Sequence, residues 1–372
     1  MSAPDPQPAP APAAASRAPE PDPRAPAVHY ALGIDSGGSG VRIALGPVGP
    51  RGAPAAEPLT WHSPTPALVG ERGIDAAGLL GQVLPAAQRL LRQAGTERVA
   101  AVCVGAAGMA SLGDDLRAHL PAALADALGP RRLALAADGV TAYVGALGQR
   151  PGAVVAAGTG MIALGTGLGT SPGTGPGDDP HGGWRRVDGW GHLLGDCGGG
   201  AWIGRAGLEA AMRAHDGRAG GSQPLLSRLE ATFGPPEHLP GLLYPRSDRP
   251  AVLASFAPEV GRCAATDPVA AAILHEAADH IARAAQAAFP HPPTTGQATH
   301  GEDAGALALT GGLFRMGAPL VDPVRRELAR RLPGVPVTEA AGDPLAGALR
   351  VASALAADAL RLPVDGELLQ VF

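Results

Sequence analysis

The chain has 372 residues, of which 45% are hydrophobic and 17% charged, and its formal net charge is −5. That length suggests one large or two ordinary domains. All 29 basic residues are arginine, because the sequence contains no lysine. A Walker-type phosphate loop, a Schiff base and a lysine general base are therefore excluded. The negative net charge gives no reason to expect binding to nucleic acid or to an anionic membrane.

Residues 1–28 are rich in proline and alanine and lack the apolar segment of a secretory signal, so we expect a disordered tail. Cys103, Cys197 and Cys263 are far apart and form no CxxC pair. This spacing argues against a disulfide framework and against a zinc or iron–sulfur site. It favours a reducing, cytoplasmic location. No apolar run reaches the ~18 residues that a membrane-spanning helix needs.

A first α/β unit is predicted after the tail. Residues 29–46 (HYALGIDSGGSGVRIALG) are typical of a β-hairpin, in which an apolar strand ends at Asp35, glycines form the turn and a second strand returns. Helical spacing of Leu and Val follows over 76–95 despite Pro85. The next elements are a buried strand over 99–110, a helix over 115–128, a strand over 132–138 and a helix over 140–148. This order predicts a compact α/β domain with both faces of its sheet covered.

The second half begins with the same pattern. Residues 151–165 (PGAVVAAGTGMIALG) repeat the strand, glycine turn and strand, and both copies contain Ile-Ala-Leu-Gly. The repetition predicts a duplicated fold, with chance similarity as the alternative in a chain so rich in glycine and alanine. Residues 190–217 are expected to form a turn that leads into an amphipathic helix. Further elements are expected at 268–289 (helix), 306–314 (strand), 322–332 (helix), 335–340 (edge strand) and 343–360 (helix).

The two glycine turns are candidate phosphate-binding loops. Hairpin tips of small residues allow backbone N–H groups to approach a phosphate chain that a Cβ atom would keep away. Only the first copy has an acid, Asp35, which would hold Mg²⁺ through a water molecule. The alternative is that both motifs are simply tight turns. The candidate phosphate-binding residues are Ser36, Gly37, Gly38, Ser39, Gly158, Thr159 and Gly160.

Asp138 is the candidate catalytic residue. It ends the strand over 132–138, and a carboxylate at the C-terminal end of a strand is well placed for chemistry. In a phosphotransferase it would accept the proton of the attacking hydroxyl group. The alternative is an N-cap for the following helix.

Three further positions have two interpretations each. Asp196 is either a helix cap or a ligand for substrate hydroxyl groups, and Gly311-Gly312 is either a turn or a surface for adenine. We interpret His192 as structural. Cys197 has no neighbouring base in the sequence that would support a role as nucleophile.

These segments, in this order, resemble the sugar-kinase/heat-shock-70/actin superfamily, and more closely the N-acetylglucosamine kinases and the BadF/BadG/BcrA/BcrD ATPase family. The resemblance extends from about Leu32 to Ala357. GIDSGGSG and AAGTGMIALG are similar to the two phosphate motifs, and LTGGLF is similar to the adenosine motif. The most specific stretch, DGWGHLLGDCGGGAWIGRAGLEAA (188–211), resembles the kinase signature GWGHxxGDEGS.

The resemblance implies an α/β fold of two ribonuclease-H-like (actin-like ATPase) domains flanking a nucleotide and sugar cleft. The domains would comprise residues 29–150 with the closing helix 343–360, and residues 151–342. The family implies ATP and Mg²⁺ as cofactors and a small amino sugar as partner. Homodimers are common among these relatives, although the sequence itself does not specify an oligomeric state.

The implied reaction is phosphorylation of N-acetylglucosamine at its 6-hydroxyl group, with Asp138 as base. GAAGM (105–109) resembles the loop that lines the sugar pocket, and the 190–196 segment would contact sugar hydroxyl groups. The implied substrate-binding residues are Gly105, Ala106, Asp138, Trp190, Gly191 and Asp196.

Departures from the family pattern leave alternatives. Gly40 and Val41 stand where the family has a basic residue and a hydroxyl, so the backbone is expected to do most of the phosphate binding. Cys197 replaces a glutamate. Glucosamine is an alternative substrate, and a catalytically weak sugar-binding regulator is an alternative function. A third alternative, the activator ATPase of 2-hydroxyacyl-CoA dehydratases, would need paired cysteines that the chain lacks.

Overall fold

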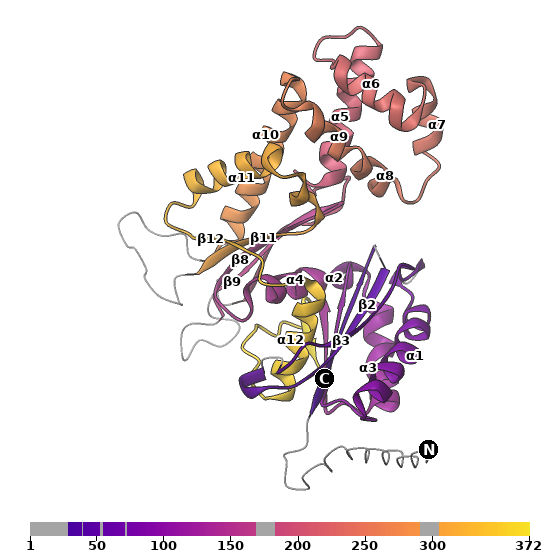
Figure 1. Ribbon diagram of the computed structural model, residues 1–372, viewed down its shortest axis with the longest axis vertical. Coiled ribbons are helices and arrows are strands. Elements are labelled where there is room, and N and C mark those ends of the chain that lie inside the picture. Colours follow the sequence, from indigo (N-terminus) through magenta and orange to yellow (C-terminus); the bar gives the residue numbers. More distant parts are fainter. Residues whose placement is uncertain (1–28, 39, 53–54, 71–72, 169–182, 291–304) are drawn as a thin grey trace, which may run out of the picture.

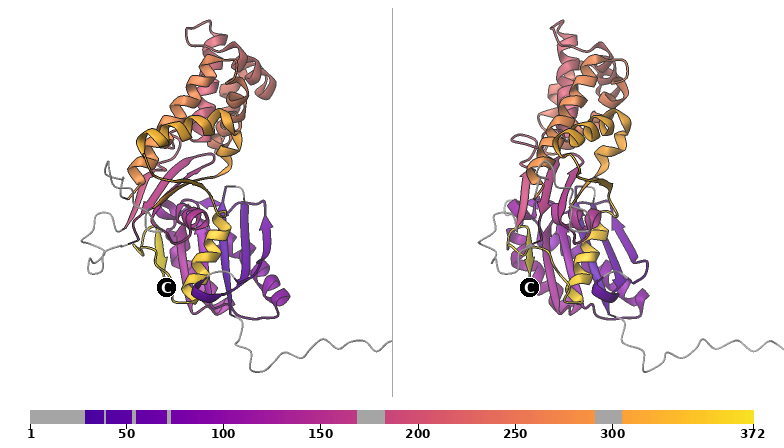
Figure 2. Two further views of the ribbon diagram at one scale, coloured as in Figure 1. Left: turned by 60° about the vertical axis from the view of Figure 1, so that its left-hand side comes forward. Right: turned by 90° about the vertical axis from the view of Figure 1, so that its left-hand side faces the viewer.

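The computed structural model of the chain describes residues 29–38, 40–52, 55–70, 73–168, 183–290 and 305–372. These residues form two α/β halves, each built on one mixed β-sheet, and a lobe of helices extends from the second half (Figure 1). Figure 2 shows from two further sides that this lobe and the first sheet lie at opposite ends of the molecule. No described helix is both long and apolar enough to cross a membrane.

The first sheet has the order β13-β7-β6-β1-β2-β3. β1 and β2 form the predicted hairpin, in which Asp35 pairs with Arg42. β6 and β7 run parallel to β1, and every residue of β6 is buried, as expected for a strand covered on both faces. The strands are β1 (Tyr30–Gly37), β2 (Gly40–Pro47), β3 (Leu59–Ser63), β6 (Ala101–Ala106), β7 (Arg132–Ala137) and β13 (Leu369–Val371), with a separate pair β4 (Val69–Gly70) and β5 (Gly73–Ile74).

The second sheet, β10-β9-β8-β11-β12, repeats this arrangement. β9 is antiparallel to both of its neighbours, β10 and β8. β11 runs parallel to β8, and β12 runs parallel to β11. The first sheet has the same order and directions in β3-β2-β1-β6-β7, so the predicted duplication is confirmed. The strands are β8 (Gly152–Ala157), β9 (Met161–Thr166), β10 (Trp184–Asp188), β11 (Ala306–Thr310) and β12 (Val337–Glu339).

The helices of the first half follow their sequence signals closely. α1 begins at the cap Asp75, whose carboxylate accepts the N–H of Ala77 at 3.0 Å, and ends at Gly95 in the left-handed conformation. Leucines spaced four apart on α3 face the core. The first-half helices are α1 (Ala76–Ala94), α2 (Met109–Leu112), α3 (Asp114–Leu128), α4 (Asp138–Leu147) and α12 (Pro344–Ala356), with the 3₁₀ turn η1 (Pro50–Gly52).

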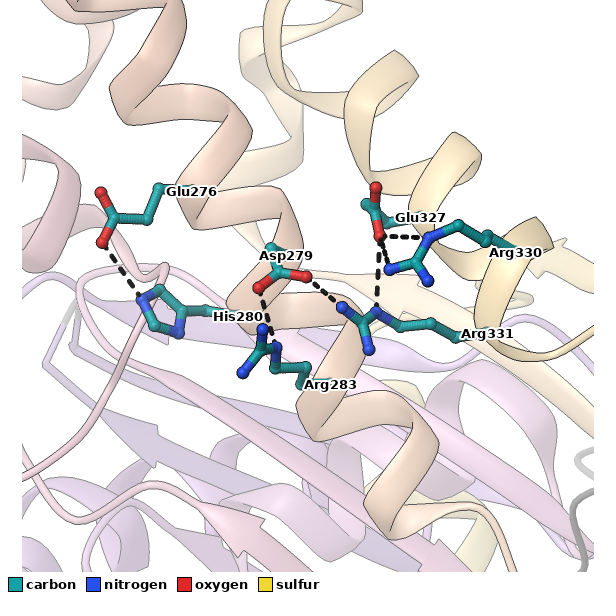
Figure 3. A network of polar contacts seen from close by, with 7 residues as sticks. All are labelled: Glu276, Asp279, His280, Arg283, Glu327, Arg330 and Arg331. Atoms are coloured by element: carbon teal, nitrogen blue, oxygen red, sulfur yellow. Dashed lines mark hydrogen bonds and ion pairs between the residues drawn. The ribbon is translucent and has the colours of Figure 1, made fainter.

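In the second half, α10 covers one face of the sheet and α11 packs on α10. An ion-pair network joins these two helices (Figure 3): Asp279 of α10 pairs with Arg283 at 2.8 Å and with Arg331 of α11, which also contacts Glu327. The second-half helices are α5 (Gly200–His215), α6 (Gln223–Phe233), α7 (Leu239–Leu243), α8 (Arg249–Ser255), α9 (Ala257–Cys263), α10 (Pro268–Ala288) and α11 (Ala318–Arg331), with the 3₁₀ turns η2 (Pro236–His238) and η4 (Gly312–Met316).

α4 lies between the two sheets. It packs against β1, β6 and β7 of the first sheet and against β8, β9 and β11 of the second. Every residue of α4 after Asp138 is buried. α4 also crosses α12 in backbone contact, because a Cβ atom at Gly347 would lie 1.8 Å from the carbonyl oxygen of Thr141 and 2.6 Å from the nitrogen of Gly145. The two halves therefore share α4 as part of their packing.

Gly347→Ala is expected to lower the free energy of unfolding by about 1–3 kcal/mol, because the new methyl group overlaps backbone atoms and the helices must separate. Gly81→Ala in α1 is the matched control, since a Cβ atom there meets nothing within 4 Å. It should stabilise the protein by about 0.5–1 kcal/mol. Thermal unfolding followed by circular dichroism would measure both. If Gly347→Ala melted at or above the wild-type temperature, the proposed helix contact would be wrong.

Candidate active site

Asp35, Gly105 and Asp138 lie at the carboxyl ends of three neighbouring parallel strands. Asp35 on β1 pairs in register with Gly105 on β6, and Gly105 pairs with Ala136 on β7. Asp138 follows β7 directly as the first residue of α4. The topology therefore brings the candidate metal ligand and the candidate base to one edge of the first sheet, and their roles remain predictions.

The GAAGM loop (105–109), which was predicted to line the sugar pocket, is exposed only in part. Gly105 and Ala106 are buried, and the side chain of Ala106 belongs to the first-half core. A Cβ atom at Gly105 would lie 2.6 Å from the methyl group of Thr141, so this glycine allows α4 to approach β6. Ala107 and Gly108 are the partly exposed members of the loop. Contact of the substrate with Gly105 or Ala106 remains a prediction, and such a contact would have to involve backbone atoms of these residues.

Arg42 contributes a cation beside the first hairpin. Its Nη2 and Nε donate to Oδ2 of Asp35 at 2.6 and 3.0 Å, and its Nη1 donates to Oδ2 of Asp343 at 2.5 Å. Asp343 also caps α12 by accepting the N–H of Ala346 at 2.9 Å. A guanidinium therefore stands opposite Asp35, and the expectation that the backbone does most of the phosphate binding at the first hairpin stays a prediction.

Asp35 meets the requirements for water-mediated Mg²⁺ binding. Burial raises the pKa of its carboxyl group, and the hydrogen bonds and charge of Arg42 oppose that rise. Arg42 uses only Oδ2, and within the described residues Oδ1 of Asp35 accepts no hydrogen bond. No group of three potential metal ligands occurs in the described part of the chain. A single carboxylate is nevertheless sufficient, since Mg²⁺ keeps several waters and takes its other ligands from phosphate groups.

The second glycine motif forms the tip of the β8–β9 hairpin. Gly158 and Thr159 are exposed, and the N–H of Gly158 donates to the carbonyl of Gly160 at 2.9 Å. The first N–H groups of α5 dock on this tip: Gly200 donates to the carbonyl of Gly158 at 2.9 Å, and Ala201 to that of Thr159 at 2.8 Å. Helix α5 therefore fixes the position of the tip.

Gly311 and Gly312 follow β11 at the same edge of the second sheet, and both are exposed. Gly311 has φ +105°, and a Cβ atom there would lie 2.2 Å from the carbonyl oxygen of Ala157, so its own fold requires glycine. Gly312 is different, because a Cβ atom there meets nothing within 4 Å.

Open space of this kind recurs at the candidate ATP-binding glycines. At Gly37, Gly38 and Gly158, as at Gly312, an added Cβ atom would meet no described atom within 4 Å, and none of the four has a positive φ that demands glycine. The protein's own packing therefore does not explain glycine at these four positions. Gly81, Gly183 and Gly241 are open in the same way outside these motifs, so the open space leaves room for a ligand at the backbone without itself showing one. Ser39, the remaining candidate residue of the first motif, lies outside the described residues, as does the predicted tail 1–28.

The segment from Asp188 to Cys197 connects β10 to the start of α5. Trp190 is 63% exposed, and the guanidinium of Arg186 lies 4.5 Å from its ring centroid. Nη2 of Arg186 also donates to the carbonyl of Gly189 at 2.5 Å. Asp196 lies against the second glycine tip, because a Cβ atom at Gly160 would be 2.4 Å from its Oδ2. The structure thus joins two predicted sites, the kinase-like segment and the second phosphate motif.

Burial is the main influence on Asp138. It is the largest of the effects that together raise the pKa of the carboxyl group to about 6. The N–H of Gly139, which donates to Oδ1 at 2.9 Å, and the charge of Arg186 lower this pKa, whereas the charge of Asp35 raises it. Arg186 belongs to the second half, so the edges of both sheets act on Asp138. A carboxyl group with a pKa near 6 is ionised at neutral pH and still able to accept a proton.

Arg42, Arg186 and Asp188 were not among the residues expected from the sequence. The position of Arg42 could have been predicted from the sequence, because the register of the β1–β2 hairpin places it opposite Asp35. Arg186 and Asp188 act through contacts that depend on how the segment after β10 folds back, which no local pattern indicates. His192 is half-buried and close enough to Asp196 to act on its carboxyl group, and its structural role stays a prediction.

A profile of the BadF/BadG/BcrA/BcrD ATPase family matches residues 32–349. Among solved structures, a Chromobacterium violaceum protein provisionally assigned as an N-acetylglucosamine kinase is 27% identical, with 87% of this chain and 99% of that chain covered and a TM-score of 0.59. A Porphyromonas gingivalis protein with the same provisional assignment is 17% identical, with 86% and 97% covered and a TM-score of 0.61, and it shows the shared fold alone. No curated protein matches the chain. Since the family profile covers most of its length, the chain belongs to the BadF/BadG/BcrA/BcrD ATPase family.

Proposed function

We propose that the protein is an ATP-dependent sugar kinase that phosphorylates N-acetylglucosamine at its 6-hydroxyl group. One observation carries the proposal: Asp138, with a pKa of about 6, lies at the sheet edge that also holds the first glycine hairpin, and Arg186 of the second half acts on it. The family supports the use of ATP. The 27% identity with the Chromobacterium violaceum protein supports the choice of an amino sugar.

The glycine motifs would bind the nucleotide. The N–H groups around Gly37 and Gly38 and those that follow Gly158 at the second tip would donate to phosphate oxygens, and the exposed surface at Gly312 would accept adenine. Asp35 would hold Mg²⁺ through water. When bound, the ion would neutralise part of the phosphate charge and help to orient the γ-phosphate.

Asp138 would then accept the proton of the sugar 6-hydroxyl group. The hydroxyl oxygen forms a bond to the γ-phosphorus while the bond from that phosphorus to the β–γ bridging oxygen breaks, and ADP leaves with the bonding electrons. The carboxylate must be ionised to act, and the charge of Arg186 favours the ionised form. Trp190 and Asp196 would contact the sugar.

The first test is ADP release by purified protein with Mg-ATP and a set of sugars: N-acetylglucosamine, glucosamine, N-acetylmannosamine, glucose and no sugar. We expect turnover with N-acetylglucosamine and none in the blank. Turnover with glucosamine alone would support the proposed kinase activity and would show that the substrate is glucosamine. Equal ADP release in all samples would favour an uncoupled ATPase, and binding of sugar without release would favour a regulator.

Asp138→Asn should bind ATP as the wild type does but lose transfer by about 10²–10⁴-fold, because the amide cannot accept the proton. In the wild type, kcat/KM should also fall about tenfold per pH unit below pH 6, where Asp138 is protonated.

The matched control for the Asp138→Asn variant is Asp126→Asn, at an exposed position on α3, which should retain full activity. Wild-type kcat in Asp138→Asn would exclude Asp138 as the base.

Asp138→Asn should also unfold less readily than the wild type at pH 7. Folding raises the pKa of this carboxyl group from 3.8 to about 6, so the wild type takes up a proton on folding between these values and loses stability as pH rises through them. The neutral amide avoids this cost, a gain of about 1–3 kcal/mol above pH 6. The gain should vanish below about pH 4. Denaturant unfolding at pH 4 and pH 7 would measure it, and an equal difference at both pH values would contradict the raised pKa.

A further inference from the structure

The segment that follows β10 has a strained backbone at both ends. Asp188 and Asp196 have φ values of +62° and +55°, in the left-handed region that residues other than glycine avoid. The described residues include only five non-glycine positions of this kind, and two of them bound this one segment. Such strain persists where surrounding contacts over-determine the conformation, and it concentrates at functional sites.

The carboxylate of Asp188 supplies those contacts. Its Oδ1 accepts the backbone N–H of Asp196 at 2.6 Å, and its Oδ2 accepts that of Cys197 at 3.0 Å. A Cβ atom at Gly195 would lie 2.3 Å from Oδ1, so the chain passes directly over the carboxylate. One side chain at the end of β10 therefore holds the point at which the segment returns to α5.

The same contacts set the position of the Asp196 side chain. Its Oδ1 accepts the N–H of Gly191 at 3.2 Å, and its Oδ2 lies against Gly160 of the second glycine tip. Asp188 thus fixes the backbone of Asp196, while Gly191 and Gly160 confine its carboxylate. The negative charge of Asp188 also adds to the effect of burial in raising the pKa of Asp196.

We propose that Asp188 is a positioning residue: it holds Asp196 against the second glycine tip, and through Asp196 it determines how tightly the sugar binds. This inference rests on the proposed function, in which Asp196 contacts the sugar. Asp188 acts through its two backbone hydrogen bonds and does not itself touch the reacting atoms.

Asp188→Gly separates this role from a simple turn. Glycine adopts φ +62° more readily than aspartate, so a residue needed only for the turn would be replaced without loss. If the carboxylate matters, Asp188→Gly should lower kcat/KM for the sugar at least tenfold, chiefly through KM, with the Kd for ATP unchanged within about twofold. Asp188→Asn, which keeps one acceptor oxygen and tolerates the left-handed region, should fall between Asp188→Gly and wild type.

Asp358→Gly is the matched control. Asp358 is also left-handed, with φ +51°, and it pairs with Arg132 at 2.6 Å outside the candidate site. This variant should keep wild-type kinetics. Melting temperatures within a few degrees of wild type would show that the variants fold.

Amide hydrogen exchange provides a readout that does not depend on the substrate. The amides of Asp196 and Cys197 should be protected in the wild type and exchange at least tenfold faster in Asp188→Gly. Unchanged kcat/KM in Asp188→Gly would overturn the proposal, whether or not protection is lost, and so would retained protection of both amides. A wild-type protein that phosphorylates no sugar would overturn the proposed function instead, while exchange would still decide whether Asp188 holds Asp196.

Discussion

The packing of α4 between two sheets is the constraint on which the candidate active site depends. Both faces of this helix are covered, and its crossing with α12 leaves no room for a side chain at Gly347. A helix held in this way cannot shift without disturbing both halves. Its first residue, Asp138, is therefore placed by the packing of α4 and does not depend on a strong contact of its own. The same burial raises the pKa of Asp138, so position and reactivity have one physical cause.

The absence of lysine gives the site a particular electrostatic character. Its described cations, Arg42 and Arg186, are guanidinium groups that already have partners: Arg42 donates to Asp35 and Asp343, and Arg186 donates to backbone carbonyls beside Trp190. A planar guanidinium with several partners loses little further freedom when it meets a ligand. Under the proposed function, a phosphate group at the first hairpin would thus exchange partners with Arg42 and would not meet a freely mobile cation.

Much of this arrangement could be predicted from the sequence. The repeated hairpin indicated the duplicated fold, and Asp35 and Asp138 were each predicted at the end of a strand. The parallel order β1-β6-β7, which brings these two ends to one edge, is known from the structure. The burial of Gly105 and Ala106 agrees with the buried strand predicted over 99–110. The close approach of α4 to Gly105 was not predictable, because it depends on how distant elements pack. Neither was the role of Asp188, because aspartate before glycine normally indicates only a turn. Its contacts with the N–H groups eight and nine residues later exist only in the folded segment.

The glycines of the site divide into two groups with different physical causes. Gly105, Gly311 and Gly347 are glycines because another part of the chain approaches within backbone contact, and their replacement would disturb the fold even without a ligand. Gly37, Gly38, Gly158 and Gly312 have open space where a side chain would be. Glycine in an open position costs conformational entropy and gains nothing for the fold. Gly81 in α1 is equally open, so the open space at both hairpins leaves room for a ligand to approach the backbone and does not by itself identify one.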